Sequence, residues 1–236
     1  MVWPAPEGTP TTGQPARLMT RYIGRDNVRK RLEWLEGTPG RTVYADGAVL
    51  VEPDEGERLV VRPQFGLVHE GEYPMVRVAP LLDELAENHL VAALLVRLGG
   101  YAVGVFDGEA LVASKVGSRF VKGRHKKGGS SSNRFRRRRE EQARALVEEA
   151  ARVGVTVLDP WRDRVQFAAL GGDRTAIEAV IAAEPKLGWL RERALERFFT
   201  VPEPRLRVLE RLPYDLYAAE VASPAPDSPD AFRHVP

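Results

Sequence analysis

The chain has 236 residues, of which 43% are hydrophobic and 29% charged, with 35 basic and 33 acidic side chains and no cysteine. This is the composition of a globular protein that buries a substantial core, and the lack of cysteine excludes disulfides and thiolate metal sites. No apolar run reaches the about 18 residues that a membrane helix needs, and the first residues do not resemble a signal peptide. We therefore expect a cytoplasmic protein without a membrane partner.

The first third of the chain predicts a small N-terminal unit. Residues 1–16 are rich in Pro, Thr and Gly and predict a loose arm. Asp26 or Asn27 is placed to cap a helix that ends at the glycines and proline of residues 37–40. Apolar, β-branched segments then predict short strands at 41–45, 48–51, 58–62 and 66–69, which gives an α/β unit over residues 17–75.

Residues 76–222 predict a second domain. A helix from Pro80 to about residue 88 leads into three strands, at 89–98, 101–107 and 109–116, which we expect to form an antiparallel meander. A long helix follows, which we expect to begin between Ser131 and Phe135 and to end at Gly154. Strands at 155–158 and 165–170, a helix at 175–184 capped by Asp173, and strands at 198–201 and 216–221 complete the prediction. The fold class is α+β, a mixed sheet with packed helices, and residues 223–236 predict a flexible tail.

Positive charge is concentrated in one segment between the meander and the long helix. From Ser114 to Arg139 there are eleven Lys or Arg and no Asp or Glu, so the rest of the chain has 24 basic and 33 acidic residues, a balance of −9. A segregated basic patch on an otherwise acidic protein favours binding to a polyanion such as a nucleic acid. The alternative is a solvated, basic helix face.

Two glycines and three serines lie inside the basic segment, directly before the long helix. Gly128 and Gly129 leave main-chain N–H groups uncovered, and a following serine can cap the helix. An exposed helix N-terminus favours phosphate or a developing oxyanion. A nucleotide-binding P-loop is excluded because Gly129 stands where its lysine should be. A capped junction without a ligand is the alternative.

This segment resembles the catalytic loop of the class-one translation release factors of archaea and eukaryotes, whose pattern is G-G-Q-S-x-x-R-F-x-R-x-R. The matching residues are Gly128, Gly129, Ser131, Arg134, Phe135, Arg137 and Arg139. Ser130 stands where the family has glutamine. The chain is shorter than a three-domain release factor, and it looks like the actinobacterial VLRF branch of the Vms-type release-factor-like proteins. The resemblance implies a release-factor middle-domain-like, ribonuclease-H-like architecture for residues 76–222.

The same resemblance implies a peptidyl-tRNA hydrolase that acts on stalled ribosomal large subunits, with ribosomal RNA and peptidyl-tRNA as partners. The implied catalytic residues are Gly128, Gly129, Ser130 and Ser131. The implied RNA-binding residues are Arg124, His125, Lys126, Lys127, Arg134, Arg136, Arg137, Arg138 and Arg139. The competing hypothesis is a non-catalytic rescue adaptor that uses the same basic loop but has lost hydrolysis together with the glutamine.

Other residues carry weaker signals. His69, His89 and His234 are isolated and predict core or surface positions, and His125 predicts a phosphate donor, with general acid–base catalysis as the alternative. Asp107 and Glu109 are conceivable nuclease ligands, but their place beside Gly108 favours a turn. We expect no metal site, no cofactor, no DNA partner and a monomeric protein. We also expect no serine nucleophile, because no carboxylate lies near His125 in sequence.

Overall fold

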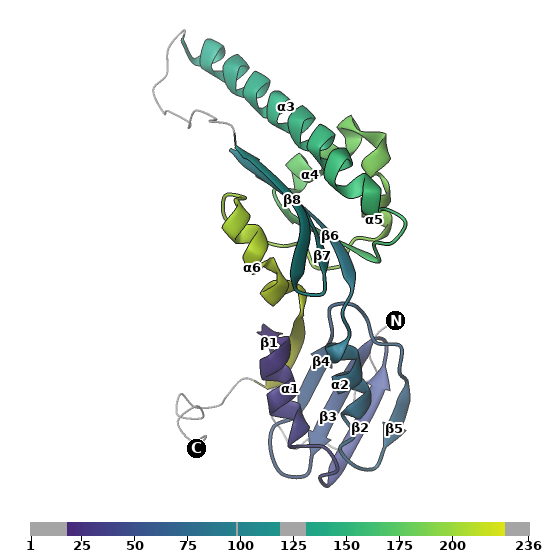
Figure 1. Ribbon diagram of the computed structural model, residues 1–236. Coiled ribbons are helices and arrows are strands. Elements are labelled where there is room, and N and C mark those ends of the chain that lie inside the picture. The colour runs from purple at the N-terminus through teal and green to yellow at the C-terminus, as the bar shows by residue number, and fades with distance from the viewer. Residues whose placement is uncertain (1–17, 98, 119–130, 225–236) are drawn as a thin grey trace.

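The structure is a computed structural model that describes residues 18–97, 99–118 and 131–224, with the backbone alone described for residues 18, 131–136 and 224. The arm predicted at residues 1–16 and residues 225–236 of the predicted tail lie outside these ranges. The described chain forms two β-sheets, one in each half of an elongated molecule (Figure 1). The predicted α+β class is confirmed. No helix in the described ranges is long and apolar enough to cross a membrane.

The first sheet has six strands in the order β1-β10-β4-β3-β2-β5, and all neighbouring strands are antiparallel. Its first five strands in chain order are β1 (Leu18–Gly24), β2 (Gly40–Ala45), β3 (Ala48–Pro53), β4 (Leu59–Arg62) and β5 (Gly71–Tyr73). Asp46 and Gly47 join β2 to β3 with positive φ angles of 51° and 70°, as a tight Asp-Gly hairpin requires. The sequence predicted β2, β3 and β4, missed β1, and wrongly placed a strand at 66–69, ahead of β5.

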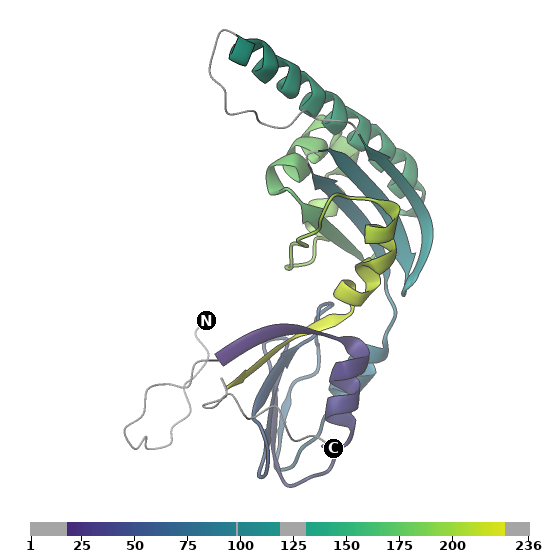
Figure 2. The same ribbon diagram turned by 90° about the vertical axis from the view of Figure 1, so that its left-hand side faces the viewer.

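Helices α1 (Arg25–Glu33) and α2 (Ala79–Ala86) cover one face of the first sheet (Figures 1 and 2). Val28 and Leu32 on α1 and Leu81 and Leu85 on α2 are buried at helical spacing. They pack in one core with inward side chains of the strands, among them Tyr44, Val49, Val51, Val61 and Val221. The core of the first unit therefore includes α2, although the predicted boundary had placed this helix in the second domain.

The last strand, β10 (Ala218–Pro224), also belongs to the first sheet. It lies between β1 and β4, with Val221 opposite Arg21 on one side and Val61 on the other. The sequence had assigned residues 216–222 to the second domain and residues 223 and 224 to the tail, and the strand pairing corrects both assignments. Without β10, β1 would have no neighbouring strand and β4 would become an edge strand with unpaired backbone groups.

The second sheet has the order β8-β7-β6-β9. Strands β6 (Leu90–Arg97), β7 (Gly100–Asp107) and β8 (Ala110–Ser118) form the predicted antiparallel meander. Gly108 has a φ of 59° in the turn after Asp107, which fits the predicted turn. Strand β9 (Phe167–Gly172) pairs with β6 in parallel. This mixed sheet, in which the fourth strand lies beside the first, has the ribonuclease-H-like arrangement that was expected.

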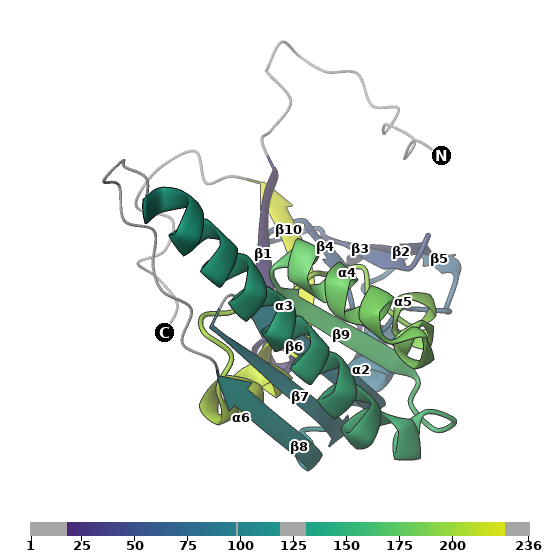
Figure 3. The same cartoon turned by 90° about the horizontal axis from the view of Figure 1, so that it is seen from above.

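Helices cover both faces of the second sheet. Helices α3 (Ser131–Leu158), α4 (Arg174–Ala183) and α5 (Trp189–Glu192) lie on one face (Figure 3), and α6 (Leu206–Leu216) packs on the other (Figure 2). Every residue from Val91 to Val96 in β6 is fully buried, as expected of an apolar central strand with both faces covered. The predicted cap of α4 is confirmed, because the Asp173 side chain accepts a hydrogen bond from Ala176 N at 3.0 Å.

Helix α3 begins at Ser131, within the predicted interval, but it does not end at Gly154. Residues 155–158, predicted as a strand, form its last turn. Gly154 is buried against Leu187, and a Cβ added to it would lie 3.0 Å from Leu187 Cδ1, so this glycine permits close packing inside the helix. The helix ends instead just before Pro160, which disfavours helical geometry at the preceding residue.

The sequence analysis missed α6. Leu209, Leu212 and Leu216 have helical spacing and are buried, but Pro213 lies among them and weakened the pattern. The strand predicted at 198–201 is also wrong: it contributes only an isolated bridge between Phe199 and Gly171 beside β9.

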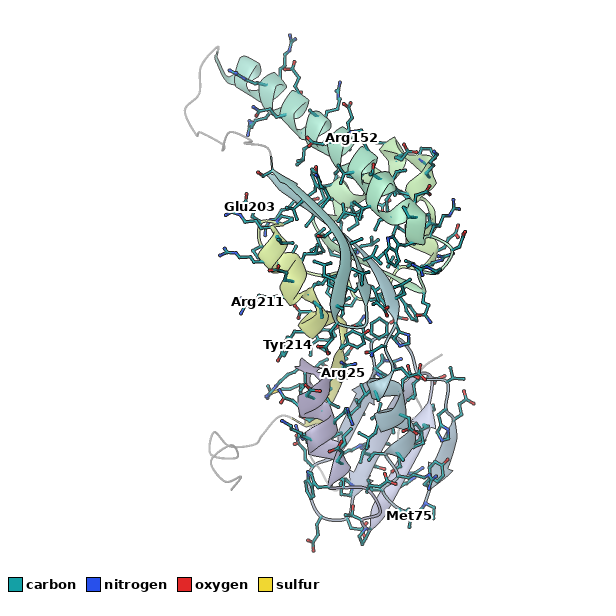
Figure 4. The ribbon with its side chains drawn as sticks, in the orientation of Figure 1. Arg25, Met75, Arg152, Glu203, Arg211 and Tyr214 are labelled. Carbon is teal, nitrogen blue, oxygen red and sulfur yellow. The ribbon has the colours of Figure 1, made fainter. Side chains whose placement is uncertain are left out.

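The chain crosses between the two units twice, from α2 to β6 and from α6 to β10. The two crossings are tied together because His89 N donates a hydrogen bond to the Tyr217 hydroxyl at 3.1 Å. Arg25, labelled in Figure 4, reaches the same junction from α1. Its guanidinium pairs with Glu109, donates to Asn88 Oδ1 at 3.2 Å and lies 4.3 Å from the centre of the Tyr217 ring. Ionic, aromatic and backbone contacts therefore join the two units.

Candidate functional site

The basic segment predicted as the functional site joins the end of β8 to the start of α3. Seven of its predicted site residues lie outside the described residues: Arg124, His125, Lys126, Lys127, Gly128, Gly129 and Ser130. Ser131 is the first residue of α3, and Arg134 and Arg136 follow in its opening turns, with the backbone alone described. The side chains of Arg137, Arg138 and Arg139 are described. The structure therefore positions the helical half of the predicted site.

Helix α3 is longer than the part of it that packs on the sheet. Among its described side chains, which begin at Arg137, Leu146 is the first that is buried. At about 1.5 Å per residue, the part from Ser131 to Ala145 extends the helix by roughly 22 Å ahead of its buried part. Figures 1 and 2 show this N-terminal part projecting beyond the strands of the second sheet. We call residues 131–145 the projecting part of α3.

The projecting part carries the described arginines of the predicted site. Arg137 and Arg138 are exposed and Arg139 is partly buried, and no described carboxylate forms an ion pair with any of the three. Positive side chains near a helix N-terminus add to the positive end of the helix dipole and repel one another. An anion bound at this end would therefore stabilise the helix, whereas the free helix carries an unfavourable charge arrangement.

One tyrosine fixes the base of the projecting part. Tyr101 on β7 is 2% exposed, and its hydroxyl donates a hydrogen bond to Glu149 Oε1 on α3 at 3.1 Å. Its ring lies against Gly117, its partner on β8, where an added Cβ would lie 2.4 Å from the tyrosine Cζ. Glycine at this position leaves room for the ring. Tyr101 thus contacts both β8, which precedes the basic loop, and α3, which follows it.

Sequence reasoning missed this arrangement of Tyr101, Gly117 and Glu149. A glycine at the end of a β-branched strand pattern indicates a close approach by another group, so Gly117 offered a usable signal. Its partner could not be found in the same way, because the pairing register of β7 with β8 decides which residue lies opposite.

The rim beside the end of β8 is held by the segment that precedes α6. Arg97, at the end of β6, donates to the Val201 carbonyl at 2.8 Å, and Gly100 lies opposite Ser118. Glu203 lies near this end of the second sheet (Figure 4) and is paired with Arg205 at 2.7 Å. Glu203 at this rim is thus paired with a basic neighbour.

Several solved structures are similar to this chain. The crystal structure of an archaeal translation termination factor, aRF1, is 15% identical with a TM-score of 0.41, and the match covers 86% of this chain and 68% of that one. A structure described as an archaeal protein is 16% identical with a TM-score of 0.36 and the same two coverages, 86% and 68%. S. cerevisiae Dom34, described as a translation termination-like factor involved in RNA quality control pathways and interacting with Hbs1, is 9% identical with a TM-score of 0.30 and covers 83% and 64%. Comparison with curated protein sequences gives no match.

A family model gives a match of a different kind. The description of that family is the Actinobacteria/Chloroflexi VLRF1 release factors, and the match spans residues 89–222. The matched range begins where the chain enters the second sheet, and it includes α3 and most of β10. It covers more than half of the 236 residues. This chain therefore belongs to the Actinobacteria/Chloroflexi VLRF1 release factor family.

Proposed function

We propose that this protein is a peptidyl-tRNA hydrolase that releases the nascent peptide from tRNA on stalled ribosomal large subunits. One observation carries the proposal: the basic N-terminal part of α3 projects well beyond the sheet, directly after the segment that resembles the release-factor loop. Membership of a release-factor family supports a ribosomal substrate.

In this proposal the arginines bind RNA phosphates and guide the loop to the reaction centre. Arg137 and Arg138 are exposed on a helix that is anchored at its other end by Leu146 and the residues after it. Phosphate contacts fix the position and orientation of a bound protein without reading sequence, which suits a factor that must act whatever peptide is attached. A long helix with one buried end holds its free end at a defined distance from the domain.

The proposed chemistry is hydrolysis of the ester between the peptide and the terminal ribose of tRNA. Water attacks the carbonyl carbon, negative charge grows on the carbonyl oxygen, and the ribose oxygen leaves with a proton. The main-chain N–H of Ser130, at the position of the family's glutamine, is proposed to stabilise that charge, a contribution typically of about 3–4 kcal/mol. Gly128 and Gly129 are proposed to let the backbone approach the ester closely.

Ser130 also motivates a second candidate function. The glutamine side chain of the release-factor pattern is absent at this position, so the basic loop could serve binding alone. In that case the protein is a non-catalytic rescue adaptor. Both candidates predict salt-sensitive binding to ribosomes, and only the hydrolase predicts peptide release.

The deciding experiment is single-turnover release of labelled peptide from peptidyl-tRNA on isolated large subunits, beside a binding assay at the same salt. We expect wild-type protein to release peptide above the background of subunits alone. We expect Gly129→Ala to abolish release and leave binding nearly intact, because a methyl group restricts the backbone and blocks approach to the ester. Binding by the wild type without release would replace the hydrolase with the adaptor.

Substitutions at Ser130 test whether the side chain contributes. Ser130→Ala should reduce release less than Gly129→Ala does, with Ser114→Ala on the exposed edge of β8 as the matched control. Ser130→Gln restores the residue of the release-factor pattern. Increased release would indicate that the loop adopts a release-factor-like pose, and decreased release would indicate a site rebuilt around a small hydroxyl group.

A further inference from the structure

Three residues that commonly bind metal ions meet at the junction of the two units, away from the basic segment. Glu84 lies in the last turn of α2, Glu87 directly after this helix, and His89 directly before β6. One carboxylate oxygen of each glutamate and one ring nitrogen of the histidine lie within 4.8 Å of one another. The sequence analysis had treated His89 as isolated, because the pattern E-x-x-E-x-H runs across a helix end and matches no familiar spacing.

The imidazole of His89 is buried without a hydrogen bond. His89 is 7% exposed, and its ring centre lies 4.4 Å from that of Phe65 and 5.2 Å from that of Phe167. Neither ring nitrogen has a hydrogen-bond partner among the described residues. The side-chain oxygen Oε1 of Gln166 accepts a hydrogen bond from Leu90 N at 3.0 Å. Buried polar atoms rarely lack a partner, so the two ring nitrogens of His89 are available to bind a ligand.

The open side of the ring faces the two glutamates. His89 Nε2 lies 4.0 Å from Glu84 Oε1, too far for a hydrogen bond but close enough to share an ion with it. Glu84 is partly buried and Glu87 is exposed, so the cluster reaches solvent at Glu87. The C-terminal end of α2 adds the negative end of a helix dipole at the same place.

The electrostatics of the cluster also favour a cation. A neutral imidazole has a free lone pair for a metal. A bound cation would offset the repulsion between the carboxylates of Glu84 and Glu87, which have oxygens within 4.8 Å of each other.

We propose that Glu84, Glu87 and His89 bind one divalent transition-metal ion, with Zn²⁺ as the best-fitting cation. Two carboxylates and an imidazole suit Zn²⁺ or Mn²⁺, whereas Mg²⁺ and Ca²⁺ prefer oxygen ligands alone. Zinc bonds of about 2.0–2.2 Å place tetrahedral ligand atoms roughly 3.4 Å apart, so the two flexible glutamate side chains need to close by up to about 1.4 Å. Water would complete the coordination, because the cluster supplies three ligand atoms.

The role of this ion is structural. It would connect α2, which packs in the core of the first sheet, to the start of β6 in the second sheet. The basic segment leaves from the end of β8, at the opposite end of the meander, which for strands of eight residues is about 25 Å away. The ion would therefore fix the angle between the two units without taking part in reactions at the loop.

The test uses the full chain without a metal-binding purification tag, first treated with a chelator. Zn²⁺, and Mn²⁺ in a parallel series, is titrated by calorimetry, and thermal unfolding is measured with and without the metal. We expect one ion per chain and a higher Tm in its presence. Glu87→Gln should weaken binding by at least about tenfold, because it removes a ligand while leaving an exposed position intact.

Asp83→Asn is the matched control, since Asp83 is an exposed carboxylate on the same helix that lies outside the cluster. It should leave the affinity and the Tm shift unchanged. Absence of stoichiometric binding by the wild type, or equal binding by the Glu87→Gln and Asp83→Asn variants, would overturn the proposal and leave His89 as a buried core histidine. Peptide release is not measured, so the result is independent of the proposed hydrolase function.

Discussion

The two ends of α3 show how one helix can divide stability from binding. From Leu146 to Leu158 the helix packs into the core of the second sheet, and its apolar side chains are held on several sides. In the projecting part no described side chain is buried, and Arg137 and Arg138 face solvent. The buried end is fixed by tertiary contacts, whereas the described side chains of the projecting part are exposed or only partly buried. Substitutions at the buried end should therefore change folding, and those at the projecting end should change binding.

The largest effect on stability is expected for Leu146→Ala. Leu146 is 3% exposed in the core beneath α3, and truncation of a buried leucine costs about 2–5 kcal/mol of unfolding free energy. Urea unfolding followed by circular dichroism measures this loss. Ribosome binding per folded molecule should stay the same. A loss below about 0.5 kcal/mol would show that α3 is not anchored at this end.

A smaller loss is expected for Gly117→Ala at the base of the projecting part. The added Cβ would lie 2.4 Å from the Tyr101 ring, and the buried ring has to move, which costs about 1–3 kcal/mol. Ser118→Ala, at the exposed neighbouring position on β8, is the matched control. Equal Tm values for the two variants would contradict the close approach of ring and strand.

Tyr101→Phe tests the contact between the sheet and α3 alone. It removes the hydrogen bond to Glu149 while keeping the ring, so we expect a loss of about 0.5–1.5 kcal/mol. Tyr214→Phe, in which the replaced ring is 68% exposed, should cost nothing measurable. If Tyr101→Phe is silent as well, the hydroxyl does not help to hold the helix.

The smallest effect on stability, together with a loss of binding, is expected for Arg137→Ala combined with Arg138→Ala. Unfolding free energy should change by no more than about 0.5 kcal/mol, because both side chains are exposed. Binding to large subunits should weaken, and the slope of log K against log salt should fall by roughly one per lost phosphate contact. Arg152→Ala, an exposed arginine at the buried end of the same helix (Figure 4), is the control. Equal salt slopes for the two variants would show that Arg137 and Arg138 are exposed side chains that do not contact RNA phosphates.

Much of the second sheet could be predicted from local patterns. The turn at Gly108, the cap at Asp173 and the start of α3 each depend on a few neighbouring residues, and the structure agrees with all three. Gly154 and Pro213 gave misleading local signals. The first is a packing position inside a long helix, and the second lies within α6.

The sequence by itself determined where positive charge gathers and which residues match the release-factor pattern. It also determined that strands and helices of one mixed α+β domain lie on both sides of the basic segment. These features depend on composition and on short-range periodicity. Only the tertiary structure decided that β10 returns to the first sheet, that Tyr101 reaches Glu149 past Gly117, and that His89 faces two glutamates. The first two depend on strand register or on segments far apart in the chain, and pairing across such distances leaves no local pattern to read. The third depends on how the chain bends between the end of α2 and the start of β6.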